Sequence, residues 1–526
     1  MNFLIEFTTQ NYKVRNSMAI HLKKLYPGSR FGGIISAHGA IKKYLESQKE
    51  VGYEFLYDIT NIQEEFLKED VPIEEIKDFE ESIPGKSLWR FVAVDREWGY
   101  QFIKGSIPVM YFSKKRVNYE NIQRIVGGYS RFFKKVLSGF NADVVIFMLG
   151  AHSVQAPILE QVCKNLKITY ISPAITKIQN YFSITSNKEM LFPQIKEAYL
   201  KNIQGELVTD SSPGEKSYEE MHSSLKNKNS TYYFDQGDNY VKKLKANKGF
   251  SFIYLVLKRI ATTFLHWYQL RTLEKQKAGK SSRYSFKSLL YFNYYNLYKV
   301  YQGRKLLKKS FYDTYNPNEK YIYFPLHVVP EYALLVRGNM WINQLFIIEN
   351  LAKSIPLDYK VYVKEHPGTI GWRVRPFSFY KEIKSYTNVK LIPPYLDNHQ
   401  IIKNSQLVIT VTGTPGWEAL LFHNKPVINL CEDFYEITGL SKRIHNIADL
   451  SKEIQSEIKR ISEISTEERK RRIVCLLNAI IINSSWADKP LRVLGEEDAP
   501  VSEQEVMDAG TLLGNEIGKY LDRLQN

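Results

Sequence analysis

The stretch TVTGTPGWEAL at 410–420 decides the fold class of this 526-residue chain. It follows the apolar run Leu407–Ile409, and the sequence changes there at once to small, polar, Gly and Pro residues. Such a change is typical of a parallel strand entering its C-terminal loop, the edge at which open α/β sheets bind ligands. The pattern predicts that Thr414 caps a helix beginning at Pro415 and preceded by Gly413, with free N–H groups facing an anion. We therefore predict a phosphate site here.

A second stretch of the same kind, KEHPG at 364–368, ends another apolar run. From residue 321 onward, such runs alternate with helical segments, which is the pattern of a parallel sheet built from βα units. We expect strands at Tyr321–Pro325, Tyr359–Lys364, Val389–Ile392, Leu407–Thr410 and Val427–Leu430, with helices near Trp341–Ser354, Phe377–Tyr386 and Trp417–Phe422.

The first half of the chain shows the same alternation. Strands are expected at Phe3–Phe7, Phe31–Ser36, Tyr53–Ile59, Asp143–Leu149 and Ile168–Ile171, with helices such as Asn11–Leu25 and Tyr119–Leu137. The sequence thus predicts an α/β fold with two domains and a cleft between their facing sheets. The expected boundaries are 1–205 for the N-terminal domain, 206–317 for a polar linker and an insertion, 318–446 for the C-terminal domain and 447–526 for a helical tail.

The composition is that of an ordinary soluble protein, with 44% hydrophobic and 24% charged residues. The chain begins without the apolar core of a signal peptide and contains no apolar run of about 18 residues. The cysteines lie far apart without a Cys-x-x-Cys pair, which indicates neither disulfides nor zinc: Cys163, Cys431 and Cys475. We expect a cytoplasmic protein without a membrane span.

The positive charge is concentrated in residues 241–311, which we call the basic-aromatic segment. It holds 17 Lys and Arg against one acid, Glu274, whereas the whole chain has a net charge of +16. Aromatic residues such as Trp267 and Tyr268 are interleaved with the charges. Helices of this kind favour an anionic membrane surface, although a helical hairpin packed on the protein has the same composition. Nucleic acid ranks last, because no nucleic-acid-binding motif accompanies the charge.

At this point the sequence resembles a known family, the capsule polysaccharide biosynthesis proteins, which are related to bacterial β-Kdo transferases. The resemblance covers about 320–440 and rests on FPLHVVPE at 324–331, YVKEHPG at 362–368, Gly371-Trp372-Arg373, Phe379-Tyr380 and ITVTGTPGWEALLFHNKPVI at 409–428. It implies a GT-B glycosyltransferase with two Rossmann-like domains and a nucleotide-sugar donor held mainly by the C-terminal domain. The basic-aromatic segment would then be a helical insertion in this fold. The stretch NLCEDFYE at 429–436 departs from the family pattern and leaves the donor open.

The histidine of KEHPG has the position of the His-Pro motif of CMP-sugar transferases. The resemblance implies that His366, with Pro367 after it, contacts the donor phosphate, whereas a core histidine at a strand end is the structural alternative. Lys364 shares one face of the extended run with His366, and it either adds charge to the phosphate site or is a solvated strand end.

The polar residues around Gly413 form the second part of the predicted site. Thr412, Gly413, Thr414 and Gly416 are expected at phosphate or ribose, although threonines are also common in strands and caps. Glu418 falls one place beyond the position of a capping-box acid, so local capping does not explain it. It is expected to accept sugar or ribose hydroxyls, as similar acids do in this fold.

Further candidates lie in neighbouring loops. Arg373 and Arg375 form either a bidentate clamp on an anion or a solvated pair. His327 and Glu331 follow the first strand of the second domain and are candidates for catalysis or donor contact, with plain surface positions as the alternative. For the acceptor-side base, His152 in FMLGAHS is preferred over His38, because Gly150 allows a tight turn at a strand end.

The absence of several motifs narrows the field. The sequence contains no Asp-x-Asp, no HExxH, no GxxxxGK[ST] and no GxGxxG, so a metal-independent enzyme without a bound cofactor is expected.

We predict a glycosyltransferase that acts on a cell-surface or capsular polysaccharide, or on a lipid-linked glycan, at the inner face of the cell membrane. A CMP-sugar is one candidate donor, and nucleic acid is not an expected partner. The alternatives are a CDP-polyol phosphotransferase of the teichoic-acid type, a sugar-nucleotide 2-epimerase and a non-catalytic assembly partner.

Overall fold

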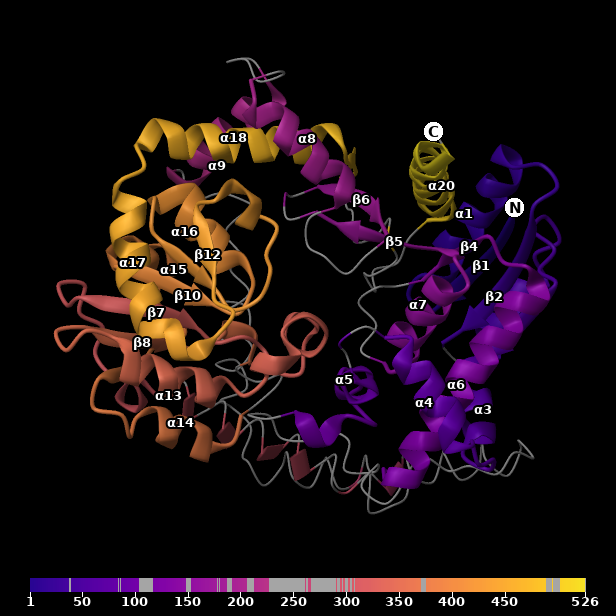
Figure 1. Cartoon of the computed structure of the whole chain (residues 1–526), viewed down its shortest axis with the longest axis horizontal. Helices are drawn as coiled ribbons and strands as arrows, with labels where there is room; N and C mark the ends of the chain where they lie inside the picture. The colour runs from indigo at the N-terminus through magenta and orange to yellow at the C-terminus, as the bar shows by residue number, and fades with distance from the viewer. Residues whose placement is uncertain are drawn as a thin grey trace. The chain divides into compact units, whose positions relative to one another are not determined.

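The structure, a computed structural model of the full chain, describes residues 1–36, 39–83, 85, 87–103, 117–147, 153–176, 178, 180–186, 192–205, 212–226, 261, 264–265, 290, 294–295, 297–298, 301–302, 305–306, 308–369, 375–488, 494 and 502–525. The chain forms two compact units (Figure 1). Unit 1 comprises residues 1–92, 119–223 and 470–526, and unit 2 comprises residues 93–118 and 224–469.

Unit 2 is built on a six-stranded sheet in the order β12-β11-β10-β7-β8-β9, and every pair of neighbouring strands is parallel. The strands are β7 Tyr321–Pro325, β8 Lys360–Lys364, β9 Val389–Ile392, β10 Leu407–Thr410, β11 Val427–Asn429 and β12 Ser441–Arg443. Five of the six were predicted within one residue at each end, because uninterrupted apolar runs are characteristic of strands buried on both faces.

The helices of unit 2 cover both faces of this sheet. They are α13 Gln344–Ser354, α14 Phe377–Ile383, α15 Asn398–Asn404, α16 Thr414–His423 and α17 Leu450–Ser462. Ile322 and Phe324 of β7 pack into one apolar core with buried residues of α13, α14 and α17. On the opposite face, the hydroxyl of Tyr321 donates to the carbonyl of Ile401 in α15 at 2.7 Å, and its ring stacks on Tyr362 at 4.1 Å.

Unit 1 has a seven-stranded sheet in the order β13-β6-β5-β4-β1-β2-β3. The strands are β1 Asn2–Phe7, β2 Arg30–Ile35, β3 Phe55–Asp58, β4 Val144–Ile146, β5 Thr169–Ile175, β6 Tyr181–Thr185 and β13 Ser485–Trp486. The five predicted strands form the parallel part. The strands β6 and β13 were not predicted, and both are added in antiparallel pairing.

The helices of unit 1 come from both ends of the chain. They are α1 Tyr12–Leu25, α2 Gly39–Glu46, α3 Ile59–Phe66, α4 Ile73–Glu81, α5 Leu88–Ala93, α6 Tyr119–Phe140, α7 Gln155–Asn165, α8 Pro193–Ile203, α9 Pro213–Lys226, α18 Thr466–Ile482 and α20 Glu503–Gln525. The chain passes from unit 2 to unit 1 within α18.

The C-terminal helix α20 lies against α1 (Figure 1). Its glycines at every fourth position allow this close approach. A Cβ at Gly510 would lie 2.3 Å from the hydroxyl of Ser17, and one at Gly514 would lie 2.8 Å from the ring of His21. The region predicted as a helical tail is therefore helical, and its end is part of the core of unit 1.

Residues 93–118 also belong to a different unit from the residues that flank them in the sequence. Within unit 2, the Arg96 guanidinium donates to the carbonyl of Pro330 at 3.3 Å. The division into units thus differs from the predicted boundaries, since residues 93–118 are not in the first unit whereas residues 206–223 and 470–526 are. Packing of segments far apart in sequence decides this division.

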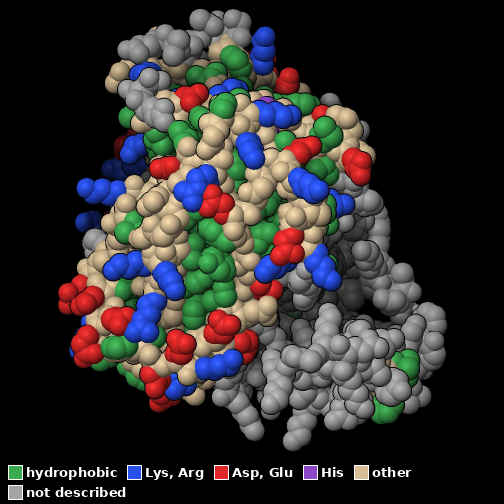
Figure 2. All heavy atoms as spheres, turned by 90° about the vertical axis from the view of Figure 1, so that its right-hand side faces the viewer, with side chains coloured by type: hydrophobic (Ala, Val, Ile, Leu, Met, Phe, Trp, Pro, Cys, Tyr) green, Lys and Arg blue, Asp and Glu red, His purple; other side chains and the backbone are tan. Residues whose placement is uncertain are grey.

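Most of the basic-aromatic segment lies outside the described residues, including Trp267 and Tyr268. Of its described positions, Leu306 is buried in the core of unit 2, whereas Phe264 is exposed. None of the described helices is long and apolar enough to cross a membrane. On the face drawn in Figure 2, Lys and Arg side chains are interspersed with Asp and Glu.

Candidate functional site

The candidate site lies in unit 2, at the sheet edge where β10, β7 and β8 end. These strands are neighbours in the sheet, and Pro325 at the end of β7 pairs with Lys364 at the end of β8. The loops that follow them therefore meet. The His327 ring reaches the carbonyl of Thr412, and Arg375 donates to the carbonyl of His327.

His327 is held from both sides. Its backbone N–H donates to the side-chain oxygen of Gln344 at 2.8 Å, and its carbonyl accepts from the same amide at 3.0 Å. The ring Nε2 faces the Thr412 carbonyl, so we assign the proton to Nε2. Nδ1 is then an acceptor, and it is buried without a hydrogen-bond partner among the described residues. Burial lowers the pKa of His327 to about 4, so the ring is neutral at pH 7.

A π-helical turn, Ala333–Arg337, follows His327, with Glu331 before it and Arg337 as its last residue. The side chain of Glu331 is exposed, and its carbonyl accepts from the N–H groups of Leu334 and Leu335. Arg337 extends in the other direction and donates to the hydroxyl of Thr412 at 2.6 Å. The turn thus brings a cation to the loop that precedes α16.

The first residue of α16 is Thr414, and Gly413 is its N-cap, so the prediction that Thr414 caps a helix beginning at Pro415 is wrong by one position. Gly413 has φ +129°, a conformation that residues with side chains rarely adopt. Thr414 is exposed, and the N-cap, a glycine, has no side chain with which to cap the helix. The positive end of α16 therefore begins at Thr414.

A buried carboxylate, Asp433, holds the loop in front of this helix. Its Oδ2 accepts from the Thr412 hydroxyl and from the Gly413 N–H, both at 2.9 Å. Thr412 and Gly413 are thus both engaged by protein groups, and the Thr412 hydroxyl links Arg337 to Asp433. Asp433 lies in the stretch that departs from the family pattern, and it was not predicted as part of the site.

Gly416 is required for packing. A Cβ there would lie 2.1 Å from the hydroxyl of Tyr435, which donates to Asn429 at 2.8 Å. The lack of a side chain at Gly416 allows this buried tyrosine to reach the helix.

Glu418, in the second turn of α16, is half-buried. Its Oε2 accepts from the side-chain amide of Asn398 at 2.6 Å, and the amide oxygen accepts from the Tyr323 hydroxyl at 2.7 Å. Among the described residues, Oε1 has no assigned partner. The carboxylate is therefore oriented by one neighbour and keeps acceptor capacity.

Lys364 is buried at the end of β8, and its Nζ donates to the carbonyl of Leu396 at 2.7 Å. Burial lowers its pKa to about 8, while Glu418 and Asp397 act in the opposite direction. The amine is therefore buried, and the alternative that Lys364 is a solvated strand end is wrong.

Glu365 and Arg375 form a buried ion pair. Both side chains are almost inaccessible, with 0% and 2% exposure, and the Arg375 Nε donates to Glu365 Oε2 at 2.7 Å. The hydroxyl of Tyr380 donates to the same oxygen at 2.8 Å, and the N–H of His366 donates to Oε1 at 2.8 Å. The Arg375 guanidinium also stacks on Phe379 at 4.6 Å. Arg375 is thus a residue of the protein interior here, not half of a solvated pair.

His366, in contrast, is exposed. Its carbonyl accepts from the N–H of Thr369 at 2.9 Å, which closes a short 3₁₀ turn beginning at Pro367. His152 and His38 of the first half, and Arg373 of the loop before Arg375, lie outside the described residues.

Comparison with known proteins identifies the sequence that surrounds this site. Residues 269–466 match the family described as capsule polysaccharide biosynthesis protein. The segment is therefore similar to this family over somewhat more than a third of the chain. The match confirms the resemblance, and it includes Lys364, Glu365, Arg375 and Glu418. A search of curated proteins gave no match.

Several solved structures are distantly similar to the chain. The β-Kdo 2,4 transferase of Thermosulfurimonas dismutans is 11% identical, with 70% of this chain and 87% of that chain covered and a TM-score of 0.31. A UDP-GlcNAc 2-epimerase from Neisseria meningitidis is 13% identical, with 99% and 100% covered and a TM-score of 0.26. A glycosyltransferase from Rickettsia africae is 10% identical, with 98% of each chain covered and a TM-score of 0.26.

Proposed function

We propose that this chain is a glycosyltransferase that moves a sugar from a nucleotide-sugar donor to a cell-surface or capsular polysaccharide acceptor. The proposal includes action at the inner face of the cell membrane, without a metal ion or bound cofactor. The family match supports a role in capsule polysaccharide synthesis. The site supports binding of a nucleotide-sugar donor. The N-terminus of α16 suits the phosphate groups of such a donor, and Glu418 on the same helix suits a hydroxyl group of its ribose or sugar.

The observation that carries the proposal is the arrangement of Glu418 on α16. The helix begins at Thr414, and its N-cap Gly413 has no side chain, so the N–H groups of the first turn suit the diphosphate or phosphate of a nucleotide sugar. One helical turn further on, Glu418 is oriented by Asn398 and keeps acceptor capacity on Oε1. A carboxylate in that position accepts hydroxyl hydrogen bonds from ribose or from the sugar.

Two further residues fit a donor at this edge. His366 is exposed directly after β8, where it can donate to phosphate oxygens. The neutral His327 ring lies at the loop before α16, with Nδ1 as an acceptor. We propose that His366 contacts the donor phosphate and that His327 positions this loop.

The test is direct binding of nucleotides by the full chain. Titration calorimetry with CMP, CDP, UDP and GDP identifies the nucleotide, and the corresponding nucleotide sugars are then assayed for transfer. We expect one nucleotide to bind, and we expect His366→Ala to weaken it by roughly 10-fold or more, the usual effect of losing a charge-assisted hydrogen bond. Absence of binding by all four, or unchanged affinity in His366→Ala, would contradict the donor assignment.

A further inference from the structure

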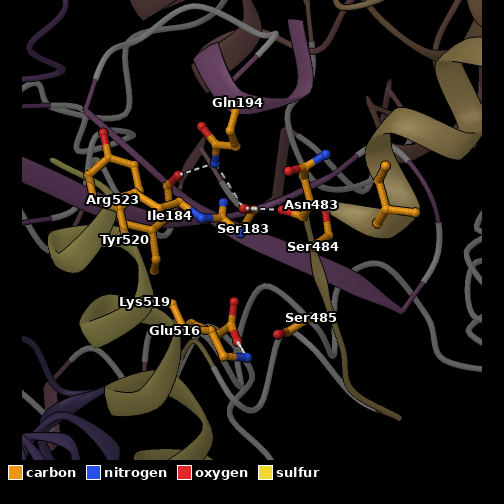
Figure 3. A pocket seen from close by; sticks show the side chains of 11 residues that line it. Ser183, Ile184, Gln194, Asn483, Ser484, Ser485, Glu516, Lys519, Tyr520 and Arg523 are labelled. Atoms are coloured by element: carbon orange, nitrogen blue, oxygen red, sulfur yellow. Dashed lines mark hydrogen bonds and ion pairs between the residues drawn. The ribbon is translucent and has the colours of Figure 1, made fainter. Parts of the chain in front are cut away.

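Unit 1 contains a polar pocket that none of the residues of the candidate donor site line. Its volume is about 80 Å³. It is lined by residues of β6, α8, the segment from α18 into β13, and α20 (Figure 3): Ser183, Ile184, Gln194, Ile482, Asn483, Ser484, Ser485, Glu516, Lys519, Tyr520 and Arg523.

One wall of this pocket is fixed by internal hydrogen bonds. The Gln194 side-chain amide donates to the Ser183 hydroxyl at 3.1 Å and to the carbonyl of Ile184 at 2.9 Å (Figure 3). The Ser183 hydroxyl in turn donates to the carbonyl of Asn483 at 2.9 Å. These contacts join β6 to the neighbouring helix α8 and to Asn483, which is 300 residues away from Ser183 in the sequence, so this side of the pocket is preformed.

The opposite situation holds for Ser484. Its hydroxyl is buried and has no hydrogen-bond partner among the described residues. A buried hydroxyl without a partner is unfavourable, and such groups commonly mark a site for a ligand or a water molecule. Ser484 is therefore an open donor in a wall that is otherwise satisfied.

The charges of the pocket leave one cation uncompensated. Lys519 donates to Glu516 at 2.7 Å, so these two groups neutralise each other on α20 (Figure 3). Arg523, one turn further along α20, has no ion-pair partner among the described residues. Its guanidinium is the natural partner for an oxyanion, because it offers several donors in one plane.

The volume limits the size of the ligand. A volume of about 80 Å³ is small for a ligand site, since pockets for drug-sized ligands span roughly 300–1,000 Å³. A phosphate group is small enough to enter it.

We propose that this pocket binds a phosphate group through Arg523 and the hydroxyls of Ser484 and Ser485. Arg523 comes from α20, and the two serines come from the segment that enters β13. The rest of a phosphate ester would remain outside. The proposal is independent of the donor site, because every residue in it belongs to unit 1.

The test uses the full chain and titration calorimetry with inorganic phosphate. Two pocket variants, Arg523→Gln and Ser484→Ala, are compared with Arg90→Gln, which removes an exposed arginine elsewhere in unit 1. We expect Arg523→Gln to weaken phosphate binding by roughly 10-fold or more, Ser484→Ala to weaken it less, and Arg90→Gln to have no effect. Nucleotide binding at the donor site should be the same in all three variants.

Two further ligands distinguish the source of the phosphate. If the wild type binds glucose 1-phosphate and Arg523→Gln does not, the ligand is a soluble phosphate ester. If the wild type cosediments with vesicles containing phosphatidic acid and Arg523→Gln does not, the ligand is a lipid headgroup. No phosphate binding by the wild-type chain, or equal phosphate affinity in the wild type, Arg523→Gln and Ser484→Ala, would overturn the proposal.

Discussion

Two carboxylates of unit 2, Glu365 after β8 and Glu418 in α16, occupy the same edge of one sheet in very different states. Glu365 is fully buried and accepts hydrogen bonds from Arg375, Tyr380 and the N–H of His366. Glu418 is half-buried and accepts one assigned hydrogen bond, from Asn398.

The difference separates groups that build the site from groups that face a ligand. A buried carboxylate surrounded by donors has little left to offer a substrate, but its loss leaves its partners unpaired. A carboxylate with one oriented oxygen and one unassigned oxygen can accept a hydrogen bond from a ligand without losing its position. On this basis Glu365 and Arg375 hold two loops together, whereas Glu418 is the candidate for contact with the donor.

The largest effect should follow from Glu365→Ala. This change leaves the Arg375 guanidinium buried without its carboxylate, and breaking a buried ion pair from one side costs about 3–5 kcal/mol of unfolding free energy. Urea denaturation of the full chain measures the loss. The matched control is Glu382→Ala, which removes an exposed glutamate of α14 and should change stability by less than about 0.5 kcal/mol. Equal stability of Glu365→Ala and the control would show that the pair contributes little.

Glu418→Gln should have the second-largest effect, and on binding instead of stability. The amide keeps the size of the side chain but removes the charge, so we expect donor affinity to fall by roughly 10- to 150-fold, the equivalent of about 1.5–3 kcal/mol. The urea midpoint should change little. A variant that binds nucleotide sugar as the wild type does, or that unfolds more easily without losing affinity, would place Glu418 among the structural carboxylates.

Asn398→Ala tests the orientation of Glu418 and should have a smaller effect. The change removes the donor to Oε2 but leaves the carboxylate in place, so donor affinity should fall by only about 1 kcal/mol, or roughly fivefold. In the Glu418→Gln background the same change should add almost nothing, because the two residues act through one contact. Additive losses in the double variant would show that Asn398 acts independently of Glu418.

Much of the sheet of unit 2 could be predicted from the sequence, because its strands are continuous apolar runs followed by Gly- and Pro-containing turns. Helix α15 was not predicted, since its seven residues have only Ile401 and Ile402 buried, although Asp397 accepts from the N–H of His399 as an N-cap does. Strands β6 and β13 were missed because β13 has only two residues and pairs with a segment about 300 residues earlier. A pairing between strands so far apart cannot be inferred from the pattern of residues within a short stretch of sequence.

The meeting of the candidate-site loops at one edge of the sheet could be predicted, whereas the partners of their residues could not. Strand ends identified the loops of His327, His366 and Thr412. The bonds from Asp433 to Thr412 and Gly413 depend on packing across 20 residues or more of sequence. One signal was available for Asp433, since it follows β11 in the same way as the predicted residues follow β8 and β10. Arg337 had no comparable signal, because a π-helical turn directs it to Thr412.

The last effect is a pH dependence that originates at His327, which contacts Arg375 of the buried ion pair and Thr412 of the loop before α16. Burial lowers the pKa of this histidine to about 4 in the folded chain, whereas an unperturbed histidine has a pKa of about 6.5. The unfolded chain therefore binds a proton that the folded chain excludes, so stability falls as the pH drops from 6.5 toward 4. Between pH 6.5 and 5.5 the expected loss is about 1 kcal/mol.

Urea denaturation at both pH values, with His327→Gln as the reference, isolates this contribution, because the other titrating groups are common to both proteins. The wild type should lose more stability than the variant over this interval. An equal or smaller loss in the wild type would show that His327 accepts a proton in the folded chain, as an imidazole facing a donor phosphate would.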